Sequence, residues 1–512
     1  MLVFYLAALA VLFVSAFWSI DSFTGKLTHV WTWTNFHTII HDSTYRQIAF
    51  RTIWMAAAVT VTDAVIAFPF AYYMARIASP RMRTILFVLV LLPLWSSYLA
   101  RIYAWRLILN QDGALNWSLA KIGLPVQSWA FTNTAMWIVF SYIWLPFMIL
   151  PVYAALERIP DSYLEASRDL GARSWTTLRR VILPLALPGV VAGSIFTFSL
   201  TLGDYITPSL VGNVDFIGNV IYRNVLGLTN NLPFAAAYAT VPAVVEARAT
   251  RLSLGLWALL VVLFLWIPLV LICVYAFNSS NIQSWPIAGF STKWFDAAWH
   301  NTEARDALVL SLKAGGLATG VALVLGTAAA AAVSRFRFFG RDAITFLLVL
   351  PIALPGVVTG IALNSFFGQN PVHHLTPSLW TIVIGHSTFC IVVVYNNVVA
   401  RLRRTQTSLT EASMDLGADG WQTFRFITFP VISTALIAGA LLAFALSFDE
   451  VIVTTFTAGA QNTLPIWILG NLRLGQQLPQ VNVVVFFVIV MTVLPVTIAQ
   501  RLTRDTGILR RR

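Results

Sequence analysis

Long apolar runs alternate with short polar segments along the whole chain. A helix needs about 20 apolar residues to cross the hydrocarbon core of a bilayer. The candidate membrane spans are residues 1–20, 52–75, 84–105, 133–156, 185–208, 233–245, 253–277, 307–333, 343–366, 379–400, 431–456 and 483–500. No polar stretch between them is long enough for a soluble domain. The pattern therefore predicts an all-α polytopic membrane protein with about twelve transmembrane helices.

Composition agrees with this pattern. Of the 512 residues, 58% are hydrophobic and 11% are charged, whereas about 25% of residues are charged in a soluble globular protein. So little charge cannot cover a water-soluble surface, and we expect the lipid bilayer to cover much of it. The two cysteines, Cys273 and Cys390, both lie in apolar runs, so neither a disulfide framework, a metal site nor a cofactor is predicted.

Basic residues are concentrated in alternate loops. Six segments hold 22 of the 33 Lys and Arg residues: 76–83, 157–183, 246–252, 334–342, 401–430 and 501–512. Short loops rich in Lys and Arg stay on the cytoplasmic side of a membrane. We therefore expect a multi-pass protein of the plasma or inner membrane with both termini in the cytoplasm. The net charge of +12 then reflects topology, and nucleic acid is not expected as a partner.

Two candidate spans need separate treatment. The run 1–20 has no basic flank and no small-residue cleavage site, so we expect a membrane helix rather than a cleaved signal. The run 233–245 has thirteen residues, which reach about 20 Å as a helix, against about 30 Å of hydrocarbon. We expect it to cross nevertheless, because otherwise the later basic loops would all lie outside the cell.

An internal repeat divides the chain. Residues 165–172 read EASRDLGA and residues 411–418 read EASMDLGA, at an offset of 246. Each copy is followed, thirteen residues after its glycine, by a proline that begins a long apolar run, Pro184 or Pro430. Such self-similarity predicts two related halves. We place them at 1–250, with spans 1–6, and 251–512, with spans 7–12, as two pseudo-symmetric six-helix units.

The repeated segments have a readable local structure. Ser162 with Glu165, and Ser408 with Glu411, have the spacing of capping boxes. Gly171 and Gly417 stand where a glycine would end the helix in a left-handed conformation. Second short helices are predicted at 175–181 and 421–427. An alternative for the two glutamates is that they only cap their helices, although this does not explain why the whole pattern recurs.

The loops 157–183 and 401–430 resemble the signature loop of binding-protein-dependent ATP-binding-cassette importers. In that family the pattern is Glu-Ala-Ala, three residues, Gly, nine residues, then Ile-x-Leu-Pro, and the loop is a coupling helix that docks on the ATPase subunit. This chain departs mildly, with Ser in third place and Phe429 in place of Leu. The resemblance implies these ATPase-coupling residues: Glu165, Ala166, Gly171, Pro184, Glu411, Ala412, Gly417 and Pro430.

The resemblance extends over nearly the whole chain. The first half is similar to the B-type permease of spermidine/putrescine importers, notably over 202–212. The second half is similar to the C-type permease, over 275–280, 290–295 and 447–451. This implies a fused polyamine permease. Within the same importer class, ferric iron, thiamine or an aminophosphonate are alternative solutes.

The motifs that the chain lacks predict its partners. No G-x-x-x-x-G-K-[ST] phosphate loop occurs in the sequence, so two copies of a separate ATP-binding subunit are expected. A periplasmic or lipid-anchored substrate-binding protein is also implied. A twelve-span secondary transporter also has two parallel halves, but the loop 246–252 is too short for its usual central loop. A membrane-embedded enzyme is disfavoured because no catalytic constellation is evident.

Ionisable residues inside spans are candidate substrate contacts, because burying them in a membrane is costly. Carboxylates and aromatic faces suit a polycation such as putrescine or spermidine. The candidate pathway residues are Asp63, Trp95, Tyr98, Asp204, Tyr205, Asp449 and Glu450. The alternative for Asp204 and Asp449 is that they cap helix ends or pair with Arg101, Arg106 or Arg223. For Asp63 the alternative is a structural hydrogen bond, and for His386 a hydrogen-bonded packing role.

Overall fold

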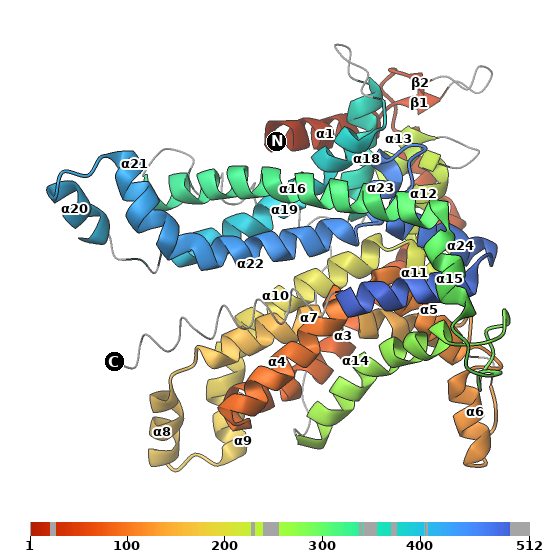
Figure 1. Cartoon of the computed structure of the whole chain (residues 1–512), viewed down its shortest axis with the longest axis horizontal. Coiled ribbons are helices and arrows are strands. Elements are labelled where there is room, and N and C mark those ends of the chain that lie inside the picture. The colour runs from red at the N-terminus through yellow and green to blue at the C-terminus, as the bar shows by residue number, and fades with distance from the viewer. Residues whose placement is uncertain are drawn as a thin grey trace. The chain divides into compact units, whose positions relative to one another are not determined.

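The computed structural model describes residues 2–20, 27–127, 129–226, 231–238, 255–336, 341, 356–369, 376–403, 405 and 408–491. These residues form helices and connecting loops, together with one antiparallel hairpin of two short strands, β1 (Ser19–Ile20) and β2 (Leu27–Thr28) (Figure 1). The all-α class predicted from the apolar runs is confirmed.

Seven helices of the described residues are long and apolar enough to cross a membrane. They are α3 with the π-helical turn η1 (Ser43–Tyr72, Tyr73–Ile77), α7 (Asn133–Glu157), α9 with η2 and α10 (Ser174–Thr177, Leu178–Ile182, Leu183–Gly203), α14 (Gly255–Ala276), α16 (Thr302–Arg335), α19 (Leu379–Leu402), and α21 with η4 and α22 (Gly420–Thr423, Phe424–Thr428, Phe429–Phe448). Their lengths and apolar composition confirm a polytopic membrane protein.

An eighth candidate is broken. The predicted span 84–105 consists of α4 (Pro80–Trp95) and α5 (Tyr98–Leu109), which are bent by 90° relative to each other. Pro93 lies inside the last turn of α4, and Ser96 follows in an extended conformation. A proline removes one helix hydrogen bond and favours such a break. The predicted span 84–105 is therefore not one continuous helix, and the bent pair still counts as one possible crossing.

The remaining helices are shorter. They are α1 (Leu2–Ser15), α2 (Thr34–His41), α6 (Ala114–Lys121), α8 (Asp161–Asp169), α11 (Ile206–Val211), α12 (Ile217–Leu226), α13 (Leu232–Tyr238), α15 (Lys293–His300), α18 (Gly356–Gln369), α20 (Ser408–Asp415), α23 (Ile452–Thr457), α24 (Leu464–Leu474) and a helix at Leu478–Met491. Half or more of each of the predicted spans 233–245, 343–366 and 483–500 lies outside the described residues, so the count of twelve stays a prediction.

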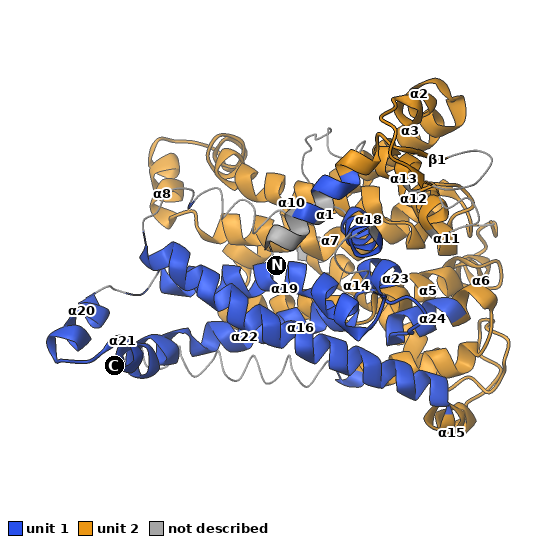
Figure 2. Ribbon diagram, turned by 90° about the horizontal axis from the view of Figure 1, so that it is seen from above, with its two compact units in different colours: residues 1–12, 301–470, 490–512 blue, residues 13–300, 471–489 orange. Residues whose placement is uncertain are grey.

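The chain divides into two compact units, coloured separately in Figure 2. Unit 2 contains residues 13–300 and 471–489. Its centre is formed by α3, α7 and α10, which run side by side in Figure 1. The close approach of α10 to α7 requires a glycine, because a Cβ atom on Gly189 would lie 2.6 Å from the Pro151 carbonyl oxygen. Small residues commonly allow this kind of close helix packing in membranes.

Helix α14 also packs in unit 2, against α3, α4 and α5. The indole nitrogen of Trp266 donates a hydrogen bond to the Leu89 carbonyl, at 3.1 Å. That carbonyl lacks its usual partner four residues later, because the residue there is Pro93. The Tyr142 hydroxyl of α7 donates to the Leu265 carbonyl at 3.1 Å. These bonds satisfy polar groups that lipid could not solvate.

Unit 1 contains residues 1–12, 301–470 and 490–512. Its centre is formed by α16, α19 and α22, which also run side by side (Figure 1). Buried alanines at helical spacing along α16, including Ala314, Ala318 and Ala322, provide the smooth surface for this packing.

The internal repeat extends well beyond the two signature segments. At a shift of 246 residues, α7 corresponds to α19, α9 to α21, η2 to η4, α10 to α22, and α11 to α23. The predicted boundary between halves at 250/251 lies outside the described residues, and it stays a prediction. Residues 255–300 follow that boundary in sequence but pack in unit 2, so the compact units are not simple cuts of the chain.

Candidate functional site

The first signature loop folds around its glycine. Helix α8 ends before Gly171, which has a φ of +71°. The Gly171 amide donates to the Arg168 carbonyl at 2.8 Å, and the Ala172 amide donates to the Ser167 carbonyl at 3.0 Å. These two bonds form a Schellman motif, in which glycine takes the left-handed conformation at low cost. The predicted helix-ending role of this glycine is confirmed.

The second loop repeats the same geometry. Gly417 has a φ of +83°, its amide donates to the Met414 carbonyl at 2.9 Å, and the Ala418 amide donates to the Ser413 carbonyl at 3.0 Å. A Cβ atom on Gly171 or Gly417 would meet nothing within 4 Å. Backbone conformation, and not crowding, is thus the reason for glycine at both places.

A hydroxyl pair closes each loop. The hydroxyls of Ser167 and Thr177 are 2.8 Å apart, and those of Ser413 and Thr423 are 2.9 Å apart. All four side chains are buried. The serine in third place, which departs from the family pattern, therefore fastens the short helix to the start of the next span.

The predicted second short helices are not separate elements. Helix α9 continues through η2 into α10, so Ser174–Gly203 is one helix of 30 residues. Helix α21 continues through η4 into α22 in the same way, over Gly420–Phe448. The predicted breaks before Pro184 and Pro430 were wrong, because each proline follows a π turn inside a continuous helix, and this turn lets the helix run on.

The first predicted capping box was also wrong. Helix α8 begins at Asp161, and the residue before it is Pro160, so Ser162 lies inside the helix and cannot cap it. Asp161 instead supplies the negative charge that favours the first turn. Helix α20 begins at Ser408 itself, and because residues 406 and 407 are outside the described part, the second box stays a prediction.

The predicted coupling residues lie on the surface of their units. Glu165, Ala166, Gly171 and Pro184 are exposed, as are Glu411, Ala412, Gly417 and Pro430. Leu170 and Leu416, beside the two glycines, are 87% and 89% exposed. The first loop surrounds a hollow of about 650 Å³, whose lining includes Tyr163, Leu170 and Arg180. Large apolar side chains this exposed typically mark a protein interface.

The predicted pathway residues of unit 2 include a buried cluster at the end of α10. Span 185–208 was predicted to be continuous, but α10 ends at Gly203 and α11 begins at Ile206. The Asp204 carboxylate joins them: it accepts from the amides of Ile206 at 2.8 Å and Thr207 at 3.1 Å, and from the Thr207 hydroxyl at 2.7 Å. The Tyr98 hydroxyl also donates to Asp204. Asp204 is fully buried and caps α11.

Unit 1 has a different elbow at the corresponding place. The predicted span 431–456 is broken where α22 ends at Phe448 and α23 begins at Ile452. Asp449 follows the end of α22, and the Glu450 carboxylate accepts from the Val453 amide at 2.9 Å. At the shift of 246 residues, Glu450 and not Asp449 is therefore the equivalent of Asp204.

His386 completes this second elbow. Its Nδ1 lies 2.6 Å from the Ser447 hydroxyl, and its Nε2 lies 2.7 Å from the Thr454 hydroxyl. Because Thr454 donates its own proton to the Glu450 carbonyl at 2.6 Å, its oxygen must accept from Nε2–H. The neutral ring with the proton on Nε2 satisfies all these groups. The predicted packing role of His386 agrees with this geometry.

The other candidates are Asp63, Tyr205 and Trp95, of which Tyr205 follows Asp204 within the first elbow. Asp63 is fully buried in α3 near the Ser141 hydroxyl, and neither of its oxygens has a hydrogen bond of ordinary geometry among the described residues. The Tyr205 ring stacks on Tyr222, with centroids 4.6 Å apart, and is fully buried. The side chain of Trp95 lies outside the described part of the structure.

The arginines considered as partners of Asp204 make other contacts. Arg223 pairs with Asp215, and Arg106 lies 5.7 Å from the Phe131 ring. None of the ion pairs among the described residues involves Asp204. In the same part of the chain, no three or more His, Cys, Asp or Glu side chains gather as a metal site would require.

Sequence reasoning missed several residues of these sites. The Ser–Thr pairs had a usable signal, because serine and threonine recur ten residues apart in both copies. Arg76, by contrast, contacts residues about 80 positions away. No local pattern indicates such a contact.

Comparisons with known proteins identify relatives of both parts of the chain. Residues 67–247 and 322–505 each match the family described as "Binding-protein-dependent transport system inner membrane component". The chain is 46% identical over 257 residues to the inner membrane ABC transporter permease protein YdcU of Escherichia coli, an alignment that spans 48% of this chain and 82% of the relative.

Two further relatives are named for their solutes. The putrescine transport system permease protein PotI of Escherichia coli is 35% identical over 236 residues, which cover 44% of this chain and 83% of PotI. The spermidine/putrescine transport system permease protein PotB of Haemophilus influenzae is 36% identical over 205 residues, which cover 39% of this chain and 71% of PotB. Each relative aligns with less than half of this chain.

Proposed function

The chain belongs to the family of binding-protein-dependent transport system inner membrane components, and on that premise we propose that it is the membrane permease of an ATP-binding-cassette importer for polyamines. Two matches to the family within one polypeptide, together covering more than half of the chain, carry this conclusion. The family transports solutes across membranes and is not a family of enzymes. Relatives named for putrescine and spermidine support the solute.

The two signature loops are the proposed contact points for ATPase subunits. Each is an exposed helix and turn that is held by one Schellman motif and one hydroxyl pair. Two such loops fit two copies of a separate ATP-binding subunit, one on each loop. The exposed Leu170 and Leu416 are suitable anchors for an apolar groove on that partner.

Transport by this arrangement proceeds by alternating access. A substrate-binding protein delivers the polyamine from outside, ATP-driven closure of the two ATPase subunits moves the two loops, and the bundle releases the solute inward. The residues proposed to line the path are Asp63, Trp95, Tyr98, Asp204, Tyr205, Asp449 and Glu450. We propose that the two halves meet at 250/251 and that both loops and both termini are cytoplasmic.

Orientation can be tested with topology reporters. One is fused after Arg251 and another after Arg341, and both are expected to report a cytoplasmic location because the basic loops stay inside. A periplasmic signal from the second reporter would mean that the segment 233–245 does not cross.

The solute is tested by uptake in a strain that lacks this permease. Radiolabelled putrescine and spermidine are expected to enter only when the chain is restored together with its ATPase and binding protein. Excess unlabelled polyamine should compete, whereas ferric iron, thiamine and an aminophosphonate should not. Competition by one of these three in place of polyamine would replace the proposed solute but keep the importer class.

A further inference from the structure

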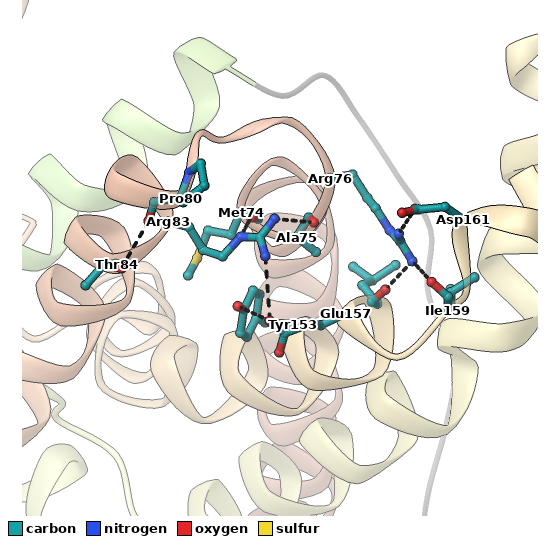
Figure 3. A network of polar contacts seen from close by, with 11 residues as sticks. Met74, Ala75, Arg76, Pro80, Arg83, Thr84, Tyr153, Glu157, Ile159 and Asp161 are labelled. Atoms are coloured by element: carbon teal, nitrogen blue, oxygen red, sulfur yellow. Dashed lines mark hydrogen bonds and ion pairs between the residues drawn. The ribbon is translucent and has the colours of Figure 1, made fainter. Parts of the chain in front are cut away.

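Arg76, at the end of α3 and η1, fastens the first signature loop to the helix bundle (Figure 3). Its NH2 group donates to the Leu156 carbonyl at 2.7 Å and to the Ile159 carbonyl. The Leu156 carbonyl lies in the last turn of α7, where it also accepts from the amides of Arg158 and Ile159, and the Ile159 carbonyl lies in the link that follows. The guanidinium thus closes the end of α7 from a neighbouring helix.

The same guanidinium also binds the first residue of α8. NH1 of Arg76 lies 2.7 Å from Oδ1 of Asp161. The Arg76 side chain is 12% exposed and that of Asp161 is 81% exposed, so the ion pair alone contributes little stability. Its role is to fix geometry, because the planar guanidinium of Arg76 holds two backbone carbonyls and the start of the coupling helix together.

A second arginine extends this connection to α4. Nε of Arg83 donates to the Met74 carbonyl at 3.0 Å, and its NH2 group donates to the Ala75 carbonyl at 3.0 Å. NH1 of Arg83 lies 3.7 Å from Glu157 at the end of α7. The turn η1 is therefore held from both sides: by Arg83 toward α4, and by its own Arg76 toward α7 and α8 (Figure 3).

The second half uses the equivalent arginine differently. Helix α16 packs against α19 and α22 as α3 packs against α7 and α10, so Arg335 at its end takes the place of Arg76, at a shift of 259 residues. Its NH2 group, however, donates to the Thr428 hydroxyl in η4, which follows the loop, at 2.5 Å. The residues at the positions that bind the arginine differ between the two halves. At the shift of 246 residues, the place of Asp161 is taken by the neutral Thr407, and the place of Thr428 is taken by Ile182, which cannot hydrogen-bond.

We infer that Arg76 is the positioning residue that passes movement of the first coupling helix to η1 and α4, and that, among the contacts of the described residues, the two arginines hold their loops at opposite ends. Arg76 holds the first loop where the chain enters α8, and Arg335 holds the second where the chain leaves toward α22. This inference rests on the proposed coupling role of the loops. According to this inference, one ion pair and two hydrogen bonds to backbone carbonyls transmit the displacement of the loop.

The experiment uses the full chain in nanodiscs with its ATPase subunits and its binding protein. Arg76→Gln removes the fork, and we expect ATP hydrolysis stimulated by the loaded binding protein to fall about tenfold, with basal hydrolysis and thermal unfolding nearly unchanged. Arg76→Lys keeps the charge but cannot hold all three oxygens, so an intermediate value is expected. A role confined to stability would instead lower the unfolding temperature and both rates together.

A partner exchange provides the sharper test. Asp161→Thr alone should lower stimulated hydrolysis about threefold. Adding Ile182→Thr recreates the arrangement of the second half around Arg76 and should restore stimulation to near the wild-type rate. The inference is overturned if Arg76→Gln keeps full stimulation, or if the double substitution is no better than Asp161→Thr. The proposed function fails separately if the loaded binding protein does not stimulate hydrolysis by the wild-type complex.

Discussion

The two halves have signature loops of the same local structure, whereas the elbows at the ends of α10 and α22 are held by different side chains. Both signature loops have a positive-φ glycine, the same two backbone bonds and a buried Ser–Thr pair. The elbows at the ends of α10 and α22 share a carboxylate that accepts from an equivalent backbone amide, that of Thr207 or Val453. They differ in their other contacts: the first carboxylate has four donors, whereas the second elbow adds a neutral histidine between two hydroxyls.

This contrast indicates which parts must stay equivalent. On the proposed function, both loops dock on copies of the same ATPase and must therefore present the same shape in both halves. The elbows have no such shared partner, so their residues are free to differ. The five predictions that follow test this division, from the largest expected effect to the smallest.

The loops are tested by the double substitution Gly171→Val and Gly417→Val. A β-branched residue is strongly disfavoured at a φ of +71° or +83°, so both helix ends should be redirected. We expect normal membrane insertion and loss of stimulated ATP hydrolysis, measured in nanodiscs with both partners. Asparagine tolerates the left-handed conformation, so the matched Asn variants should keep most of the stimulation. Full stimulation in the Val variant would contradict a coupling role.

The elbows are compared by Asp204→Ala and Glu450→Ala. Asp204 is fully buried with four donors, and leaving these unpaired should cost ~3 kcal/mol. Glu450 accepts from the Val453 amide, and its loss should cost ~1 kcal/mol. Thermal unfolding in detergent measures the difference. Equal shifts for the two variants would show that the elbows are energetically alike.

The role of Asp204 in transport is separated from its role as a cap by Asp204→Asn. Asparagine still caps α11 but carries no charge, so we expect near-normal folding and reduced polyamine uptake. Unchanged uptake in both Asp204→Asn and Glu450→Gln would leave these carboxylates purely structural.

The histidine elbow is tested by replacing its residue with the one found in the first half. At the shift of 246 residues His386 corresponds to Phe140. The substitution His386→Phe leaves the Ser447 and Thr454 hydroxyls without their hydrogen bonds to the imidazole nitrogens. We expect a loss of ~2 kcal/mol, seen as a lower unfolding temperature. His386→Gln, which can still bond to one hydroxyl, should lose less. An unfolding temperature unaffected by His386→Phe would refute the assigned network.

The smallest effect is expected from the hydroxyl pairs. Ser167→Ala and Ser413→Ala each remove one hydrogen bond, worth ~1 kcal/mol. Because the pairs have the same geometry, the two variants should reduce stimulated hydrolysis modestly and to the same extent. A large difference between them would show that the loops are not equivalent.

Local physics explains what the sequence alone could predict. Long apolar runs indicated the helices because spanning segments must satisfy their own backbone, and the glycine after EAS-x-D-L indicated the left-handed turn. The elbows were missed because apolar residues continue past Asp204 and Asp449 into α11 and α23, so hydropathy shows no break. The π turns η2 and η4 were missed because their residues also suit an ordinary helix.

Long-range packing could not be read from the sequence. Nothing local in α14 indicates that Trp266 will find the carbonyl left free by Pro93, or that this helix will pack in unit 2. The capping box at Ser162 was a plausible motif, but α8 begins one residue earlier, at Asp161. Contacts such as that of Trp266 depend on residues that are distant in the sequence, and a single sequence does not show which distant residues meet.

The central claim is ATP-coupled import of polyamine, and reconstitution tests it most directly. The chain is placed in liposomes with its ATPase subunits inside and its binding protein outside, and uptake of radiolabelled putrescine and spermidine is followed. The account predicts uptake that requires internal ATP and the binding protein, persists when ion gradients are collapsed, and is lost in the Gly171→Val and Gly417→Val double variant. Uptake driven by an ion gradient without ATP would contradict it.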